Sequence, residues 1–123
     1  MMSDRREFGQ EGESIAVRYL KKNGYKILEQ NYRTKLGEID IIAKDMDTLV
    51  FVEVKARRSR QFGNPKYAVT RKKQRKISMV ALYYLKATKQ NDAKARFDVV
   101  AIHSGQDKPS IEIVKNAFEL SYR

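Results

Sequence analysis

The chain has 123 residues and no cysteine, and its 26 lysine and arginine residues against 15 acidic residues give a formal charge of +11 at pH 7. This length fits one domain over residues 1–123, and the composition excludes disulfides and thiolate metal sites. No apolar run is long enough to cross a membrane and no apolar signal segment opens the chain, so we expect a cytoplasmic protein that does not act on membranes.

The first periodic segment, residues 5–23, predicts an amphipathic helix that ends before Gly24. Its apolar positions recur at helical spacing and form one stripe: Phe8, Ile15, Ala16, Tyr19 and Leu20. Two glycines, Gly9 and Gly12, each weaken the helix by about 1 kcal/mol relative to alanine. They indicate either a frayed start of the helix or a close approach of its backbone to another element.

Alternating or apolar segments after this helix predict β-strands over residues 25–32, 38–44, 49–57, 97–103 and 110–115. A basic loop is expected over residues 58–67. A second helix is expected from Arg71 to about Thr88, with Thr70 as its N-cap. The order α-β-β-β-α-β-β predicts an α/β fold in which helices flank a mixed central sheet.

The second and third strands form a hairpin, because residues 45–48 supply turn chemistry between them. If the turn is centred between Met46 and Asp47, paired residues have numbers that add to 93. Asp40 then lies opposite Glu53, with Cβ atoms about 4.5–5.5 Å apart. The two-residue period places Lys55 on the same face.

Two opposed carboxylates in an apolar stretch require a cation between them or a shifted pKa. Lys55 supplies part of the positive charge, and Mg²⁺ or Mn²⁺ would supply the rest, since these ions prefer oxygen ligands. Such a site suits phosphodiester hydrolysis, with Lys55 steadying the developing negative charge. The alternative is that these residues form the solvated face of a hairpin, and a register slip of one residue would move Asp40 to the other face.

The sequence pattern of the hairpin, residues 37–43 followed by residues 49–55, resembles the metal-site hairpin of the PD-(D/E)XK nuclease superfamily. The fuller pattern resembles the YraN family, relatives of the archaeal Holliday junction resolvases. It covers nearly the whole chain, through segments 12–13, 19–20, 24–25, 31–33, 57, 62–63, 73, 96–98 and 116–118. One position departs from the superfamily pattern, because Ile39 stands where the superfamily has proline.

The resemblance implies roles for particular residues. Asp40 and Glu53 match the acids that bind the metal ion, and Lys55 matches the catalytic lysine. The carbonyl of Val54 would be a backbone ligand. Glu13 matches an acid that related resolvases place on the first helix, so the resemblance implies that it is a further catalytic, metal-binding acid. It lies on the margin of the apolar stripe, from which it can lean toward the sheet.

The positive charge favours DNA as the partner, because phosphates bound by lysine and arginine release condensed counterions. Arg57 ends the predicted third strand and Arg58 follows it, and Lys73 and Lys76 lie in the first turns of the second helix. We expect these two clusters to contact phosphates on either side of the scissile bond. A charged face that serves only solubility, or RNA binding without chemistry, is the alternative.

The sequence therefore predicts a restriction-endonuclease-like domain that hydrolyses DNA with Mg²⁺ or Mn²⁺. Selectivity for branched DNA and a homodimer are further expectations, taken from the resolvase relatives. Two other hypotheses remain: a nucleic-acid-binding module of nuclease fold without activity, and an accessory subunit of a larger DNA-processing complex whose hairpin a partner completes.

Overall fold

The computed structural model describes residues 4–57, 67–103 and 110–121, with side chains from Glu11 onward. Its elements are α1 (Asp4–Lys22), β1 (Lys26–Thr34), β2 (Gly37–Asp45), β3 (Thr48–Arg57), α2 (Arg71–Ala87), β4 (Ala95–His103) and β5 (Ser110–Phe118). The predicted order and fold class are confirmed. The largest difference is in β5, which continues three residues beyond its predicted end.

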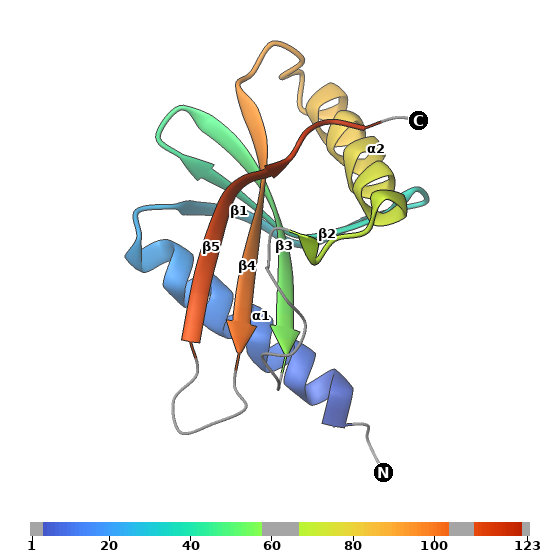
Figure 1. The fold of residues 1–123 in the computed structure, drawn as a ribbon. Coiled ribbons are helices and arrows are strands. Elements are labelled where there is room, and N and C mark those ends of the chain that lie inside the picture. The colour runs from blue at the N-terminus through green and yellow to red at the C-terminus, as the bar shows by residue number, and fades with distance from the viewer. Residues whose placement is uncertain (1–3, 58–66, 104–109, 122–123) are drawn as a thin grey trace.

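The five strands lie in the sheet in their chain order, so β3 is the central strand (Figure 1). Neighbouring strands are antiparallel except for β3 and β4, which are parallel. A parallel pair cannot be closed by a short turn, and α2 lies in the long connection between these two strands. The sheet is therefore mixed, as predicted.

The two helices cover opposite faces of the sheet, and each face has its own apolar core (Figure 1). Ala16, Val17 and Leu20 of α1 pack on one face. Ile77, Val80, Ala81, Tyr84 and Leu85 of α2 pack on the other. Successive side chains of β3 alternate between the two cores, with Val50 and Val52 on the α1 side and Leu49 and Phe51 on the α2 side.

Helix α2 begins where the sequence predicts. The side chain of Thr70 accepts a hydrogen bond from the backbone N–H of Lys73 at 3.1 Å, which satisfies one of the unpaired donors of the first turn. No acidic residue lies in that turn. Among the described helices, neither is both long and apolar enough to cross a membrane.

A polar network lies buried between β4 and the start of β1. Asp98 is fully buried, and its carboxylate accepts hydrogen bonds from the Arg96 guanidinium at 3.0 Å, the Tyr25 hydroxyl at 3.1 Å and the Asn116 backbone N–H at 2.9 Å. Arg96 also donates to Asp45 at 2.7 Å. Burial, together with the charge of Asp98, raises the pKa of Tyr25 to about 12. The network thus connects the end of β2 in the hairpin with β4 and β5.

The glycine at position 12 marks a close approach of α1 to β3. A Cβ built on Gly12 would lie 2.9 Å from the Cβ of Ala56, which is shorter than real Cβ contacts. Ala56 cannot move aside without its backbone. The expectation of a close backbone approach is therefore confirmed at Gly12, while the side-chain surroundings of Gly9 lie outside the described residues.

Gly12→Ala is expected to lower the free energy of unfolding by about 1–3 kcal/mol because it overpacks this contact. In a helix without such a contact the same change would stabilise the protein by about 1 kcal/mol. The sign of the change in stability therefore shows whether the close contact is present. Urea denaturation monitored by circular dichroism measures it. Ser14→Ala, at an exposed position of the same helix, is the control. A Gly12→Ala protein as stable as the wild type would contradict the close approach.

Candidate active site

The hairpin of β2 and β3 has the predicted register. Its pairs run from Asp45 with Thr48 to Ile41 with Val52, and their numbers add to 93 throughout. Asp40 and Glu53 lie one residue beyond the last of these pairs. The backbone N–H of Val54 donates a hydrogen bond of 2.8 Å to Oδ2 of Asp40, which fixes this carboxylate against β3.

Glu53 is an acid in an apolar environment. It is 5% exposed and follows the buried residues Phe51 and Val52 on the central strand. Burial raises the pKa of Glu53 to about 8, and the negative charge of Asp40 and a hydrogen bond with it add to the increase. The ammonium groups of Lys73 and Lys55 act in the opposite direction. Two carboxylates thus share one partly buried place.

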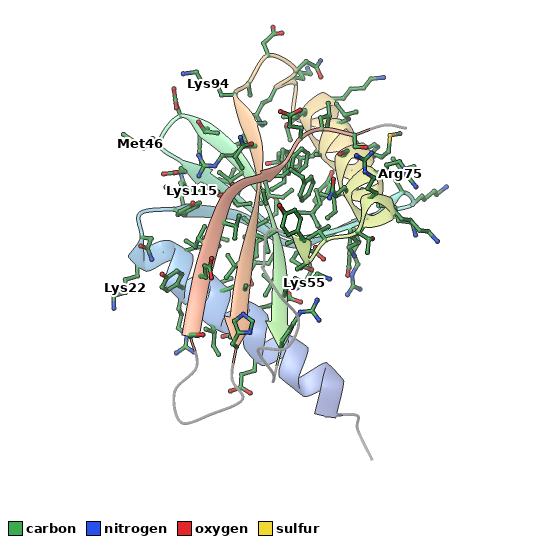
Figure 2. The ribbon with its side chains drawn as sticks, viewed as in Figure 1. Lys22, Met46, Lys55, Arg75, Lys94 and Lys115 are labelled. Carbon is green, nitrogen blue, oxygen red and sulfur yellow. The ribbon has the colours of Figure 1, made fainter. Side chains whose placement is uncertain are left out.

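Two lysines from different elements point at the same oxygen of Glu53. Nζ of Lys55, on β3, lies 3.8 Å from Oε2 of Glu53, and Nζ of Lys73, on α2, lies 3.7 Å from it. Figure 2 shows Lys55 on the side of the sheet where α2 lies. We call Asp40, Glu53, Lys55 and Lys73 the acid centre. Lys73 was expected to contact phosphate, and its contact with Glu53 was not predicted.

Glu13, on α1, is influenced by one member of the acid centre, Asp40. Burial raises the pKa of its carboxyl, and the negative charges of Asp40 and Glu38 contribute to the increase. A hydrogen bond from the side chain of Asn31 opposes it. Glu13 is therefore close enough to Asp40 for the two charges to interact.

Asn31 holds Glu13 from β1 and has no role in the sequence-based hypothesis. It lies between the pairs Gln30 with Ile41 and Tyr32 with Ile39, and so opposite Asp40. Its φ is 52°, in the left-handed region that asparagine tolerates better than most residues. An asparagine near the end of the predicted strand, where its tolerance of positive φ allows an irregularity, is the signal by which the residue could be found.

The donor set of the acid centre fits a hard divalent cation. Asp40 and Glu53 supply carboxylate oxygens. The pKa of Glu53 is raised mainly by burial and then by the charge of Asp40, and a cation would neutralise that charge. Across the described ranges, no group of three His, Asp or Glu side chains is already arranged to hold a metal ion. Asp40 and Glu53 therefore form a pair, and Glu13 does not complete a three-acid cluster in this arrangement.

Two of the three remaining predicted phosphate contacts, Arg57 and Lys76, lie within the described residues. Arg57 ends β3, two residues after Lys55. Lys76 is exposed on α2, one turn beyond Lys73, and packs toward the β1–β2 turn at Gly37. Arg58 lies outside the described residues. Figure 2 shows the labelled basic side chains Lys22, Arg75 and Lys94 on several sides of the molecule.

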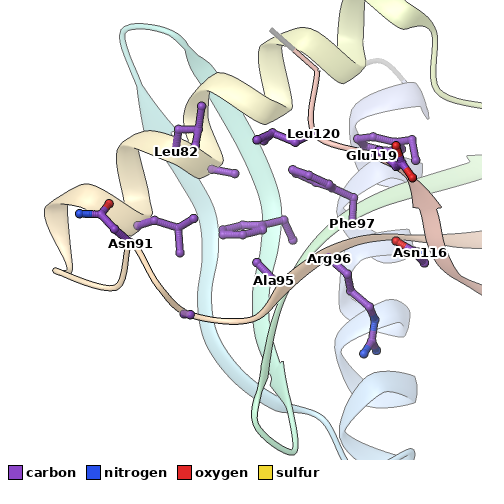
Figure 3. A pocket seen from close by; sticks show the side chains of 13 residues that line it. Leu82, Asn91, Ala95, Arg96, Phe97, Asn116, Glu119 and Leu120 are labelled. Carbon is purple, nitrogen blue, oxygen red and sulfur yellow. The ribbon is translucent and has the colours of Figure 1, made fainter.

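A separate pocket of about 350 Å³ opens at the C-terminal half of α2 (Figure 3). Leu82, Phe97 and Leu120 give it apolar walls, and Asn91 and Asn116 add amide groups. No residue of the acid centre lines it. The pocket therefore does not belong to the candidate site.

The comparison with protein families decides the identity of the chain. The family model described as "Uncharacterised protein family UPF0102" matches residues 12–102. The chain belongs to the UPF0102 family. The YraN-like family expected from the motifs is thereby confirmed, and the matched residues of this UPF0102 protein include Glu13 and the whole acid centre.

Similar proteins carry the same family name over almost their whole length. The UPF0102 protein of Desulfosudis oleivorans is 55% identical over 97% of this chain and 95% of its own. The UPF0102 protein of Geobacter metallireducens is 53% identical over 95% of this chain and 96% of its own. That of Caldicellulosiruptor saccharolyticus is 49% identical over 94% of this chain and 99% of its own. A structure of Pyrococcus furiosus SfsA in complex with Ca²⁺ is similar over 91% of this chain and 64% of that one, with 15% identity and a TM-score of 0.41.

Proposed function

We propose that this UPF0102 protein is a metal-dependent endonuclease that hydrolyses DNA phosphodiester bonds, and that it belongs to the PD-(D/E)XK superfamily. The observation that carries the proposal is the acid pair of the hairpin. Asp40 is fixed on the backbone of Val54 at 2.8 Å, and the buried Glu53 is close enough to Asp40 for its pKa to be raised. A protein that only bound DNA would gain nothing from two carboxylates facing phosphates.

Asp40 and Glu53 would hold Mg²⁺ or Mn²⁺, with the carbonyl of Val54 as a backbone ligand. When bound, the ion polarises the phosphoryl group and makes a water molecule more acidic. Glu13, held by Asn31, faces Asp40 and would bind a water molecule at the edge of the site. Lys55 would orient the attacking water or stabilise the negative charge that develops on phosphate. The reaction adds one water molecule across a P–O bond.

The charge of +11 supports a nucleic acid as substrate. Arg57, Arg58 and Lys76 would contact the DNA backbone beside the acid centre. Selectivity for branched DNA and action as a homodimer are parts of the proposal taken from the resemblance to resolvases, and a cytoplasmic location agrees with a DNA substrate. These parts can be tested separately from hydrolysis itself.

Asp40→Asn is expected to lower metal-dependent cleavage by about 10³-fold, because the amide keeps the hydrogen bond from Val54 but loses the charge that holds the ion. Cleavage of fluorescent linear and four-way-junction DNA with Mg²⁺ or Mn²⁺ measures the effect. Asp47→Asn, a change of the same kind at the exposed hairpin turn, is the control. Equal cleavage by all three proteins would exclude this site.

The same assay separates the two other hypotheses. Salt-dependent DNA binding by the wild type, without cleavage under any divalent metal, would favour a binding module of nuclease fold. Activity that appears only after a co-purifying protein is added would identify an accessory subunit.

A further inference from the structure

Lys73 is a second lysine in a centre for which the hairpin motif provides only one. Its ammonium group lies 3.7 Å from Oε2 of Glu53, and that of Lys55 lies 3.8 Å from the same oxygen. Lys55 reaches Glu53 from the same strand, whereas Lys73 reaches it from α2, on the face of the sheet that Glu53 occupies. The contact thus joins the helix to the catalytic hairpin.

The start of α2 holds Lys73 in an electrostatically unfavourable place. Thr70 accepts a hydrogen bond from its backbone N–H, so Lys73 is fixed in the first turn of the helix. A cation in this turn opposes the helix dipole, and the turn contains no acidic residue. Glu53 is the anion that compensates Lys73 in the described structure. An anion at this place, whether from the protein or from a ligand, therefore stabilises the lysine.

The charges of the centre change when its proposed ligands bind. If the neighbouring Glu13 is counted with the acid centre and all three carboxyl groups are ionised, three acids and two lysines leave one negative charge. A divalent cation would turn this into one positive charge, which matches a single phosphodiester group. Once the cation neutralises Glu53, the oxygen no longer needs two ammonium groups.

Lys73 is the lysine better placed to leave. Its side chain is 40% exposed, whereas that of Lys55 is 29% exposed. Lys73 also has a long flexible stem on a fixed helix, so its ammonium can move by rotation of side-chain bonds while the backbone stays in place.

We infer that Lys73 is a substrate-contacting residue of the active site. Its ammonium group pairs with Glu53 in the protein without ligands and moves to an oxygen of the scissile phosphate in the complex with DNA. The inference rests on the proposed function. It assigns to α2 a direct part in the reaction, beyond a general attraction of the DNA backbone.

The test measures Mn²⁺ binding and DNA cleavage separately, in wild type, Lys73→Ala and Lys73→Arg. Lys86→Ala, an exposed lysine in the last turn of the same helix, is the control for the loss of one charge. Titration calorimetry with Mn²⁺ alone is done at about 0.15 M ionic strength, where charges beyond about 8 Å are screened.

Lys73→Ala is expected to bind Mn²⁺ on the order of tenfold more tightly, because an ammonium that competes for Glu53 is gone. Its kcat for labelled DNA is expected to fall by about 10²-fold, because the ammonium group that would contact the phosphate in the transition state is missing. Lys73→Arg should keep more of the activity, and Lys86→Ala should match the wild type in both measurements.

Two results would overturn the inference: Mn²⁺ affinity unchanged in Lys73→Ala, or cleavage that falls no more than in Lys86→Ala. Failure of the proposed function is recognised by a different result: Asp40→Asn would then also leave Mn²⁺ affinity and cleavage unchanged. A Lys73→Ala protein that does not fold would be recognised by circular dichroism, and Lys73→Arg then supplies the comparison.

Discussion

Glu53→Gln is expected to produce a protein that is more stable at pH 8 and does not cleave DNA. The glutamine keeps the shape of the buried side chain and removes a charge that burial and Asp40 make unfavourable. We expect a gain of about 2 kcal/mol in the free energy of unfolding at pH 8 and a loss of about 10³-fold or more in cleavage. Such opposite effects are typical of residues kept for function at the expense of stability.

The pH dependence follows from the direction of the pKa shift. Glu53 has a pKa of about 8 in the folded protein, above its ordinary value of 4.5. The folded state therefore holds this proton more tightly than the unfolded state between these two values. Its contribution to stability is complete below pH 4.5 and is lost as pH rises toward 8. The difference in stability between Glu53→Gln and wild type should grow over this window.

Urea denaturation of both proteins at several pH values between 5 and 9 measures this difference. Mn²⁺ provides the control, because a ligand that binds only the folded state stabilises it in proportion to its occupancy. Wild type at pH 8 should gain stability with Mn²⁺, and Glu53→Gln should gain little. A glutamine variant less stable than wild type at pH 8 would show that the buried charge of Glu53 does not destabilise the folded protein.

Asp98→Ala is expected to lower the free energy of unfolding by about 3–5 kcal/mol. The aspartate is fully buried, and its removal leaves Arg96, the Tyr25 hydroxyl and the Asn116 N–H without the oxygens to which they donate. Unsatisfied buried donors cost more than the hydrogen bonds themselves contribute. Asp45 can compensate only part of this loss, through its 2.7 Å contact with Arg96.

Thermal and urea unfolding measure the effect of Asp98→Ala, with Asp92→Ala as the control at an exposed position. The Asp98 network contains no residue of the acid centre, so any DNA cleavage by the folded fraction should keep the metal dependence of the wild type. A change of less than 1 kcal/mol, as is common for surface residues, would contradict the structural importance of the network.

Local patterns were sufficient to predict the hairpin. Residues 45–48 fix its turn, and the alternation of apolar residues in β3 fixes the face of Glu53 and Lys55. The same kind of local information placed Thr70 at the start of α2. In each case the deciding contacts join residues close in the chain, or follow directly from strand periodicity.

Contacts between distant segments were beyond such reasoning. Lys73 meets Glu53 across the α2 crossover, and Asp98 meets Tyr25 across 73 positions of the chain. The salt bridge of Asp98 with Arg96 joins residues two positions apart, but the full network depends on how β4 packs against β5 and the start of β1. The register shift between Ile27 and Glu29 in β1 was also not predicted, because no glycine or proline marks it.

The space left by the missing side chain at position 12 also matters for the chemistry. Gly12 directly precedes Glu13, and Ala56 directly follows Lys55, so the two smallest side chains of this contact each adjoin a candidate active-site residue. Together they set the spacing between the helix that carries one acid and the strand that carries the lysine. A larger group at either position would push α1, and with it Glu13, away from β3, and it would disturb the core on the α1 side, against which Ala56 packs.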